Sequence, residues 1–165
     1  MDLCRIGENM KKLLLFSLIL FVAVIMTGCF TPKEMKYFAD ETNYVVGSGI
    51  VEQISYYQDS NNLYISIREE DASKCGFAVS TFRIIGENVD AMWPENIMEH
   101  IHIGDEIVFI TAPRVIGDGW SPPIVALEIN GEQYLEYAVG FANWQAWLSE
   151  QTVVPIFALS LVQGS

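Results

Sequence analysis

The two histidines of the chain, His100 and His102, come closest to a metal-binding pattern. On a strand, two histidines separated by one residue would point to the same side, which is a common arrangement of zinc ligands. Here the pair falls at the end of an expected helix, where residues i and i+2 do not share a face. No third or fourth ligand has a matching spacing, so we expect no metal ion. An exported enzyme that uses His100 or His102 with a nearby carboxylate is kept as an alternative.

Other catalytic patterns are missing from the sequence. Gly47-Ser48-Gly49 lacks one spacer of the G-x-S-x-G nucleophile elbow. There is also no Cys-x-x-Cys, phosphate loop or dinucleotide fingerprint. Two oxygen-rich stretches, 59–62 and 69–71, do not follow the calcium ladder of an EF-hand, and we expect both to be solvated turns. The sequence points to no cofactor and favours a binding role over an enzymatic one.

Aromatic and basic side chains on the expected strands and loops form the remaining candidate site. Such side chains can stack on sugars, peptides or single-stranded nucleic acid. The net charge of −12 argues against nucleic acid, because phosphate binding needs a basic surface. We therefore expect a protein, peptide or glycan ligand, with the alternative that the aromatics only cap the core. The candidate residues are Tyr56, Tyr57, Tyr64, Arg68, Arg83, Arg114 and Trp120.

Five strands are expected to position these residues. The apolar residues of 63–67 alternate with polar ones, which predicts a half-buried strand. The irregular run 49–57 before it predicts a strand with a bulge, and 58–62 between the two has hairpin chemistry. Further strands are expected at 77–85, 107–110 and 124–129, and Asn130-Gly131 predicts a tight turn into a returning segment at 133–135.

Two short helices complete the expected fold. Apolar residues at helical spacing predict one helix over 93–101, between the third and fourth strands, and another over 141–148. This order of elements is that of an OB barrel, and region 49–135 resembles the OB-like domains of small exported lipoproteins. The resemblance implies a mainly β, five-stranded barrel that binds through strands two and three and adjacent loops. An open α+β sheet is the alternative.

The N-terminus carries the strongest pattern in the chain. Two lysines precede an apolar run, 13–26, which is typical of an export signal. The sequence Ile25-Met26-Thr27-Gly28-Cys29 resembles the lipobox of bacterial lipoproteins. The resemblance implies cleavage after Gly28 and a diacylglycerol thioether on Cys29, with the protein anchored on the outer face of the cytoplasmic membrane or in the outer membrane. An uncleaved signal anchor, an ordinary signal peptide and a buried core helix are the alternatives.

Translation is expected to start at Met10, directly before the lysines. Codons for Gly7-Glu8-Asn9 can contain a purine-rich ribosome-binding sequence ahead of Met10. The expected organisation is then a leader and signal peptide over 1–28 and a lipidated tether over 29–43. An OB-like domain with a C-terminal helix follows over 44–151, and an apolar tail over 152–165 is too short to span a bilayer and is expected to pack on the domain. Cys75 is expected to be inert, since acidic residues precede it.

Overall fold

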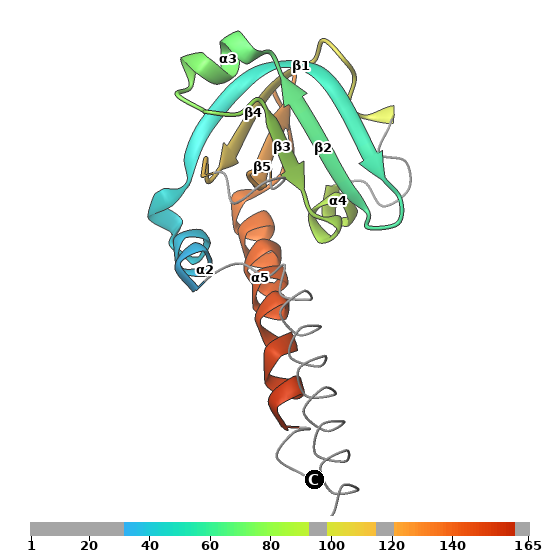
Figure 1. Cartoon of the computed structure of the whole chain (residues 1–165). Helices are drawn as coiled ribbons and strands as arrows, with labels where there is room; N and C mark the ends of the chain where they lie inside the picture. The colour runs from blue at the N-terminus through green and yellow to red at the C-terminus, as the bar shows by residue number, and fades with distance from the viewer. Residues whose placement is uncertain (1–31, 93–98, 115–120, 161–165) are drawn as a thin grey trace, which may run out of the picture. The chain divides into compact units, whose positions relative to one another are not determined.

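The computed structural model describes residues 32–92, 99–114 and 121–160, with side chains described as far as residue 150. The chain divides into two units, Pro32–Leu148 and the remainder, and all contacts described below lie within the first. Figure 1 shows a curved sheet with short helices around it. The strands are β1 (Val45–Tyr57), β2 (Asn62–Ile67), β3 (Thr81–Ile84), β4 (Glu106–Thr111), β5 (Ile124–Ile129) and β6 (Glu132–Leu135), and the helices are α2 (Pro32–Ala39), the 3-10 helix η1 (Glu41–Asn43), α3 (Glu69–Lys74), α4 (Gly86–Met92) and α5 (Tyr137–Ser160).

The long strand β1 serves both halves of the sheet. Its residues 45–50 pair with β4, and its residues 51–57 pair with β2. The register shifts between Val51 and Gln53, which confirms the predicted bulge. Because a bulge bends its strand, β1 can curve from one partner to the other, as Figure 1 shows.

The described residues form one six-stranded sheet in the order β3-β2-β1-β4-β5-β6, with antiparallel neighbours throughout. The prediction of a mainly β fold with short helices is confirmed. The count of five strands is wrong, because Glu132–Leu135 pairs with β5 as a sixth.

The expected closed barrel is also wrong, since the sheet remains open. Strands β3 and β5 approach each other at an isolated parallel bridge between Arg83 and Pro123. There the amide of Arg83 donates to the carbonyl oxygen of Pro122 over 2.9 Å. Pro122 and Pro123 have no N–H group, so they cannot extend this contact into a regular ladder.

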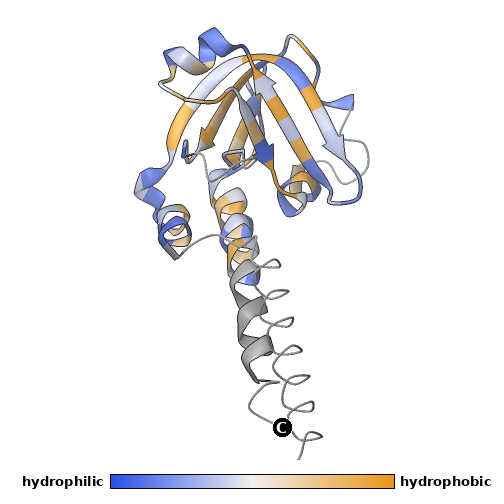
Figure 2. Cartoon of the chain, viewed as in Figure 1, coloured by the Kyte–Doolittle hydropathy of each residue, from blue (hydrophilic) through white to orange (hydrophobic). Residues whose placement is uncertain are grey.

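The core lies on one face of the curved sheet. Leu63, Ile65 and Ile67 of β2 are each 0% exposed, which confirms the predicted alternation, and Figure 2 shows apolar and polar residues alternating along this strand. The rings of Phe82 and Phe109 lie 4.7 Å apart in the same core. Full burial of each such side chain contributes about 2 kcal/mol to stability, so the core holds β1–β5 in place.

The helix expected over 93–101, between the third and fourth strands, falls mostly outside the described residues. Helix α4 covers Gly86–Met92, immediately after β3, while residues 93–98 of the expected helix lie outside the described residues. The apolar pattern missed α4 because its buried positions hold Gly86, Asn88 and Val89 rather than a stripe of large apolar residues.

The acidic stretch at 69–71 was expected to be a solvated turn but begins helix α3. Its three carboxylates occupy the first turn, where the helix dipole favours negative charge. The expected tether is packed as well: Phe38 of α2 is 1% exposed and its ring lies 5.7 Å from that of Trp144. The compact unit therefore begins at Pro32, ahead of the predicted boundary at residue 44.

Helix α5 includes the predicted helix at 141–148 and continues as far as Ser160. Trp144 and Leu148 are buried on its inner face. None of the described helices has both the length and the apolarity needed to cross a membrane.

Candidate functional site

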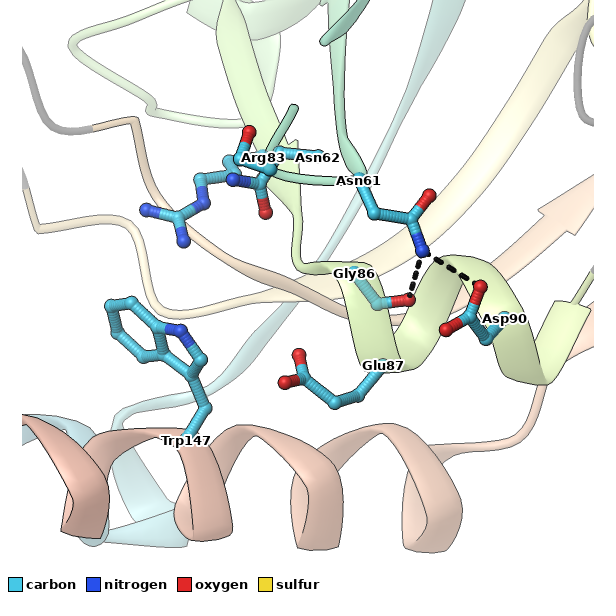
Figure 3. A pocket seen from close by; sticks show the side chains of 8 residues that line it. Asn61, Asn62, Arg83, Gly86, Glu87, Asp90 and Trp147 are labelled. Atoms are coloured by element: carbon cyan, nitrogen blue, oxygen red, sulfur yellow. Dashed lines mark hydrogen bonds between the residues drawn. The ribbon is translucent and has the colours of Figure 1, made fainter. Parts of the chain in front are cut away.

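A pocket of about 370 Å³ opens beside the β1–β2 turn, and its volume is within the range of small-molecule sites. Its walls come from this turn, from β2 and β3, and from helices α4 and α5 (Figure 3). We call it the Arg83 pocket. It is lined by Ser60, Asn61, Asn62, Arg83, Gly86, Glu87, Asp90 and Trp147.

Asn61 joins the β1–β2 turn to helix α4. Its amide nitrogen donates to the carbonyl oxygen of Gly86 over 3.3 Å and to Oδ1 of Asp90 over 2.7 Å. Its side-chain oxygen accepts from the hydroxyl of Tyr56 over 2.6 Å. The backbone at Asn61 has a φ of 52°, a left-handed conformation that asparagine tolerates better than most residues. This one side chain therefore fixes two walls of the pocket against each other.

Gly86 allows α4 to approach the turn closely. A Cβ atom at this position would lie 3.1 Å from Cβ of Asn61 and 3.3 Å from the carbonyl oxygen of Ser60. These separations are shorter than ordinary van der Waals contact, so a larger residue would push the turn away from the helix.

Among the charged residues named as lining the pocket, Arg83 is the most deeply buried, with 8% of its surface exposed. It lies on β3 opposite Tyr64 of β2, and its guanidinium carbon is 4.7 Å from the ring centre of Trp147. Burial lowers the pKa of Arg83, whereas nearby Tyr64 and Glu87 act to raise it. A guanidinium remains charged in proteins, so the pocket holds a largely desolvated cation.

The ring of Trp147 in α5 contacts both Arg83 and Trp144. Arg83 lies over the ring, and the ring of Trp144 stacks on Trp147 at 5.0 Å with an interplanar angle of 14°. Stacking on Trp144, which is itself buried, holds the indole of Trp147 in a fixed place.

The acidic residues of the pocket lie on α4. Figure 3 shows the carboxylate of Glu87 pointing into the same space as the guanidinium of Arg83, with Asp90 beside Asn61. The lining therefore combines one cation with two carboxylates, together with the amide of Asn62 and the hydroxyl of Ser60. Such a set can bind hydrogen-bond donors and acceptors at once.

Three of the predicted site residues are brought together near this pocket. Arg83 lines it, Tyr64 is the cross-strand neighbour of Arg83, and the ring of Tyr57 lies 5.3 Å from that of Tyr64. Tyr57 is 58% exposed. Tyr56 takes part indirectly, through its hydrogen bond to Asn61.

The remaining predicted residues are not part of this group. Arg68 is exposed at the start of α3, beyond the far end of β2. Arg114 lies 5.3 Å from the ring centre of Tyr37 in α2. Cys29 and Trp120 lie outside the described residues.

The exposed histidine pair lies in the segment just before β4. The backbone amide of His102 donates to Oδ2 of Asp105 over 2.6 Å, and Nδ1 of His102 is 3.7 Å from the same oxygen. Burial acts to raise the pKa of Asp105, but hydrogen bonds from Asn130 and His102 outweigh it and lower this pKa. These contacts close the turn at Gly104, and they include no nucleophile. Within the described ranges, no group of three or more His, Cys, Asp or Glu side chains could hold a metal ion.

Several pocket residues were missed at the sequence level. Residues 58–62 were assigned to a turn and Trp147 to the apolar face of a helix, but nothing linked them to Arg83. Glu87 and Asp90 gave no local signal at all. A search for polar residues next to a buried arginine would have found them only with the fold in hand.

Comparison of this chain with protein-family models, with curated proteins and with solved structures found no match.

Proposed function

We propose that this protein is a lipid-anchored binding or accessory module of the bacterial cell envelope, and that it holds its ligand in the Arg83 pocket. The observation that carries the binding role is the buried guanidinium of Arg83 at the wall of an open polar pocket. Desolvating a charge is costly, and contact with a ligand of complementary charge can offset that cost.

Anchoring is supported by the lipobox-like sequence that ends at Cys29 and by the apolar run before it. Processing there would leave the domain outside the cytoplasm, tethered by lipid. Two or more acyl chains give stable attachment, because each buried CH₂ contributes about 0.8 kcal/mol.

An OB-like arrangement of the domain is part of the proposal. The strand order, the bent β1 and the parallel bridge between β3 and β5 all support it. OB-like domains bind through strands two and three and the adjacent loops. The Arg83 pocket draws Asn62 from β2, Arg83 from β3 and Asn61 from the β1–β2 turn.

Neither alternative function has a supporting observation of this kind. Two carboxylates in the pocket lining would repel a phosphate backbone, which weakens the case for nucleic acid. The histidines stand in a turn closed by Asp105, away from the pocket residues.

The binding role is tested by a thermal-shift screen of small molecules against the domain, in which amino acids, neutral sugars and dicarboxylates are the probes. A true ligand raises the melting temperature of the wild-type domain and not that of an Arg83→Met variant. The matched control is Arg68→Met, which removes an exposed arginine outside the pocket and should leave binding intact. Absence of any Arg83-dependent shift across the screen would overturn the binding role.

Anchoring is tested separately with the full chain in a bacterial host. Wild-type protein should incorporate labelled palmitate, whereas Cys29→Ser should not and should accumulate as unprocessed precursor. Equal labelling of the two proteins would contradict lipidation at Cys29.

A further inference from the structure

Building on the proposed function, we infer that the Arg83 pocket takes a free α-amino acid, with the carboxylate against Arg83 and the ammonium group against Glu87 and Asp90. The inference deepens the binding role by naming the class of ligand. Four features of the pocket lead to it: the ring contacts of Trp147, the balance of charge, the geometry of Arg83, and the volume of the pocket.

The contacts that the Trp147 ring already makes argue against a ligand stacked on it. A sugar ring or a base needs an open aromatic face to lie on. Arg83 lies over the ring of Trp147, and Trp144 stacks on it at 5.0 Å. The indole therefore forms a wall of the pocket and holds Arg83 in place, and recognition falls to the polar groups.

The charges of the pocket match a zwitterion better than a simple ion. Arg83 supplies one positive charge, and Glu87 and Asp90 supply two negative charges. A plain anion would be repelled by the two carboxylates, and a plain cation by the guanidinium. A molecule that carries both an ammonium group and a carboxylate satisfies the two walls together.

The geometry of the arginine suits a carboxylate in particular. A guanidinium can donate two parallel hydrogen bonds to a carboxylate, and stacking on Trp147 restricts its orientation in advance. The amide of Asn61 holds Asp90 of α4 at 2.7 Å, so this carboxylate is also fixed before a ligand arrives.

The size of the pocket suits a small molecule. A volume of about 370 Å³ lies near the lower end of the range for small-molecule sites. It accommodates one amino acid.

The test measures binding of the twenty common amino acids and of D-alanine to the folded domain by Trp fluorescence and calorimetry. The best binder is then compared with its two closest analogues, one without the ammonium group and one without the carboxylate. For alanine these are propionate and ethylamine. Each analogue should bind about tenfold or more weakly, because it keeps only one of the two charge–charge contacts that the amino acid makes with the pocket.

Two variants report on the two walls separately. Glu87→Gln keeps the shape of an exposed side chain, so the variant should fold normally. Its affinity for the amino acid should be about tenfold lower than that of wild type. Arg83→Met should abolish binding. Glu69→Gln, which neutralises an exposed carboxylate on α3, is the matched control and should bind as wild type does.

The outcomes separate this inference from the proposed function. Binding of an amino acid that depends on Arg83 and Glu87 supports both. If a neutral sugar or a dicarboxylate binds in an Arg83-dependent way and no amino acid binds, the inference of an amino acid ligand is overturned. The proposed binding role then still stands. The inference of an amino acid ligand is also overturned if the analogue without the ammonium group binds as tightly as the amino acid, or if Glu87→Gln leaves the affinity for the amino acid unchanged. No Arg83-dependent ligand of any kind overturns both.

Discussion

Two asparagines in left-handed conformations fasten two different parts of this sheet in nearly the same way. Asn61 has a φ of 52° and joins the β1–β2 turn to α4, while Asn130 has a φ of 51° and joins the β5–β6 turn to the start of β4. Each donates its side-chain amide to an aspartate, Asp90 in one case and Asp105 in the other, over 2.7 and 2.9 Å.

The two contacts differ in what surrounds them. Asn61 is half-buried, accepts a hydrogen bond from the hydroxyl of Tyr56 and lines the Arg83 pocket. Asn130 is exposed, accepts a hydrogen bond from the backbone amide of Glu106 and is not among the residues that line the pocket. The same arrangement, a left-handed asparagine hydrogen-bonded to an aspartate, therefore borders the proposed binding site at one position and the β5–β6 turn at the other. What distinguishes the first is the buried arginine beside it.

Asn61→Ala is expected to have the largest effect on stability. It removes three hydrogen bonds, each worth about 1 kcal/mol net, so the domain should lose about 3 kcal/mol. The left-handed backbone adds about 1 kcal/mol of strain for alanine that glycine would not have, so Asn61→Gly should be milder. Urea denaturation of both variants measures the difference. A loss below about 1 kcal/mol for Asn61→Ala would mean that these hydrogen bonds do not hold the pocket.

Asn130→Ala should cost less, because it removes two side-chain hydrogen bonds that are exposed to water and together worth about 1–2 kcal/mol. The left-handed backbone adds about 1 kcal/mol of strain, as it does at Asn61. Asn130→Ala should also leave ligand affinity unchanged, whereas Asn61→Ala should weaken binding by loosening the pocket wall. Urea denaturation and calorimetry on the two variants make the comparison direct. Weaker binding in Asn130→Ala would show that the second turn contributes to the site after all.

The smallest expected effect is the pH dependence contributed by Asp105. Its pKa in the folded protein is lowered, so its contribution to stability is complete above its unfolded pKa of about 3.9 and is lost as the pH falls through the lower folded value. As the pH falls below about 4, wild type should lose stability more steeply than Asp105→Asn. Asn130→Ala should also flatten the slope, since it removes one hydrogen bond that lowers this pKa. Parallel stability curves for all three proteins would contradict this assignment.

The parts of the fold that depend on neighbouring residues could be predicted from the sequence. The alternation at 63–67, the bulge in β1 and the Asn130-Gly131 turn each follow from local chemistry, and the structure contains all three. The start of β1 was missed because Gly47 interrupts the pattern. A Cβ there would lie 2.5 Å from the ring of Phe77, so close packing, which is a long-range property, requires the glycine.

The Arg83 pocket could be predicted only in part. Alternation along strand two showed that Tyr64 lies on its polar side. Arg83 was proposed beside it because the OB resemblance implies binding through strands two and three, and the structure pairs the two residues. Glu87, Asp90 and Trp147 could not be added, since they lie on two helices that reach the strands only through tertiary packing. The apolar pattern did not predict α4, which supplies both acidic residues of the pocket.

The account is tested most directly by mapping amide and indole chemical shifts while the best-binding amino acid is titrated into the domain. The largest changes should fall on Asn61, Asn62, the first turn of α4 and the indole N–H of Trp147, with none at Asn130 or Asp105. A titration in which the Trp147 indole does not move, or in which the changes gather around Asp105 and Asn130, would contradict the assignment of the Arg83 pocket as the binding site.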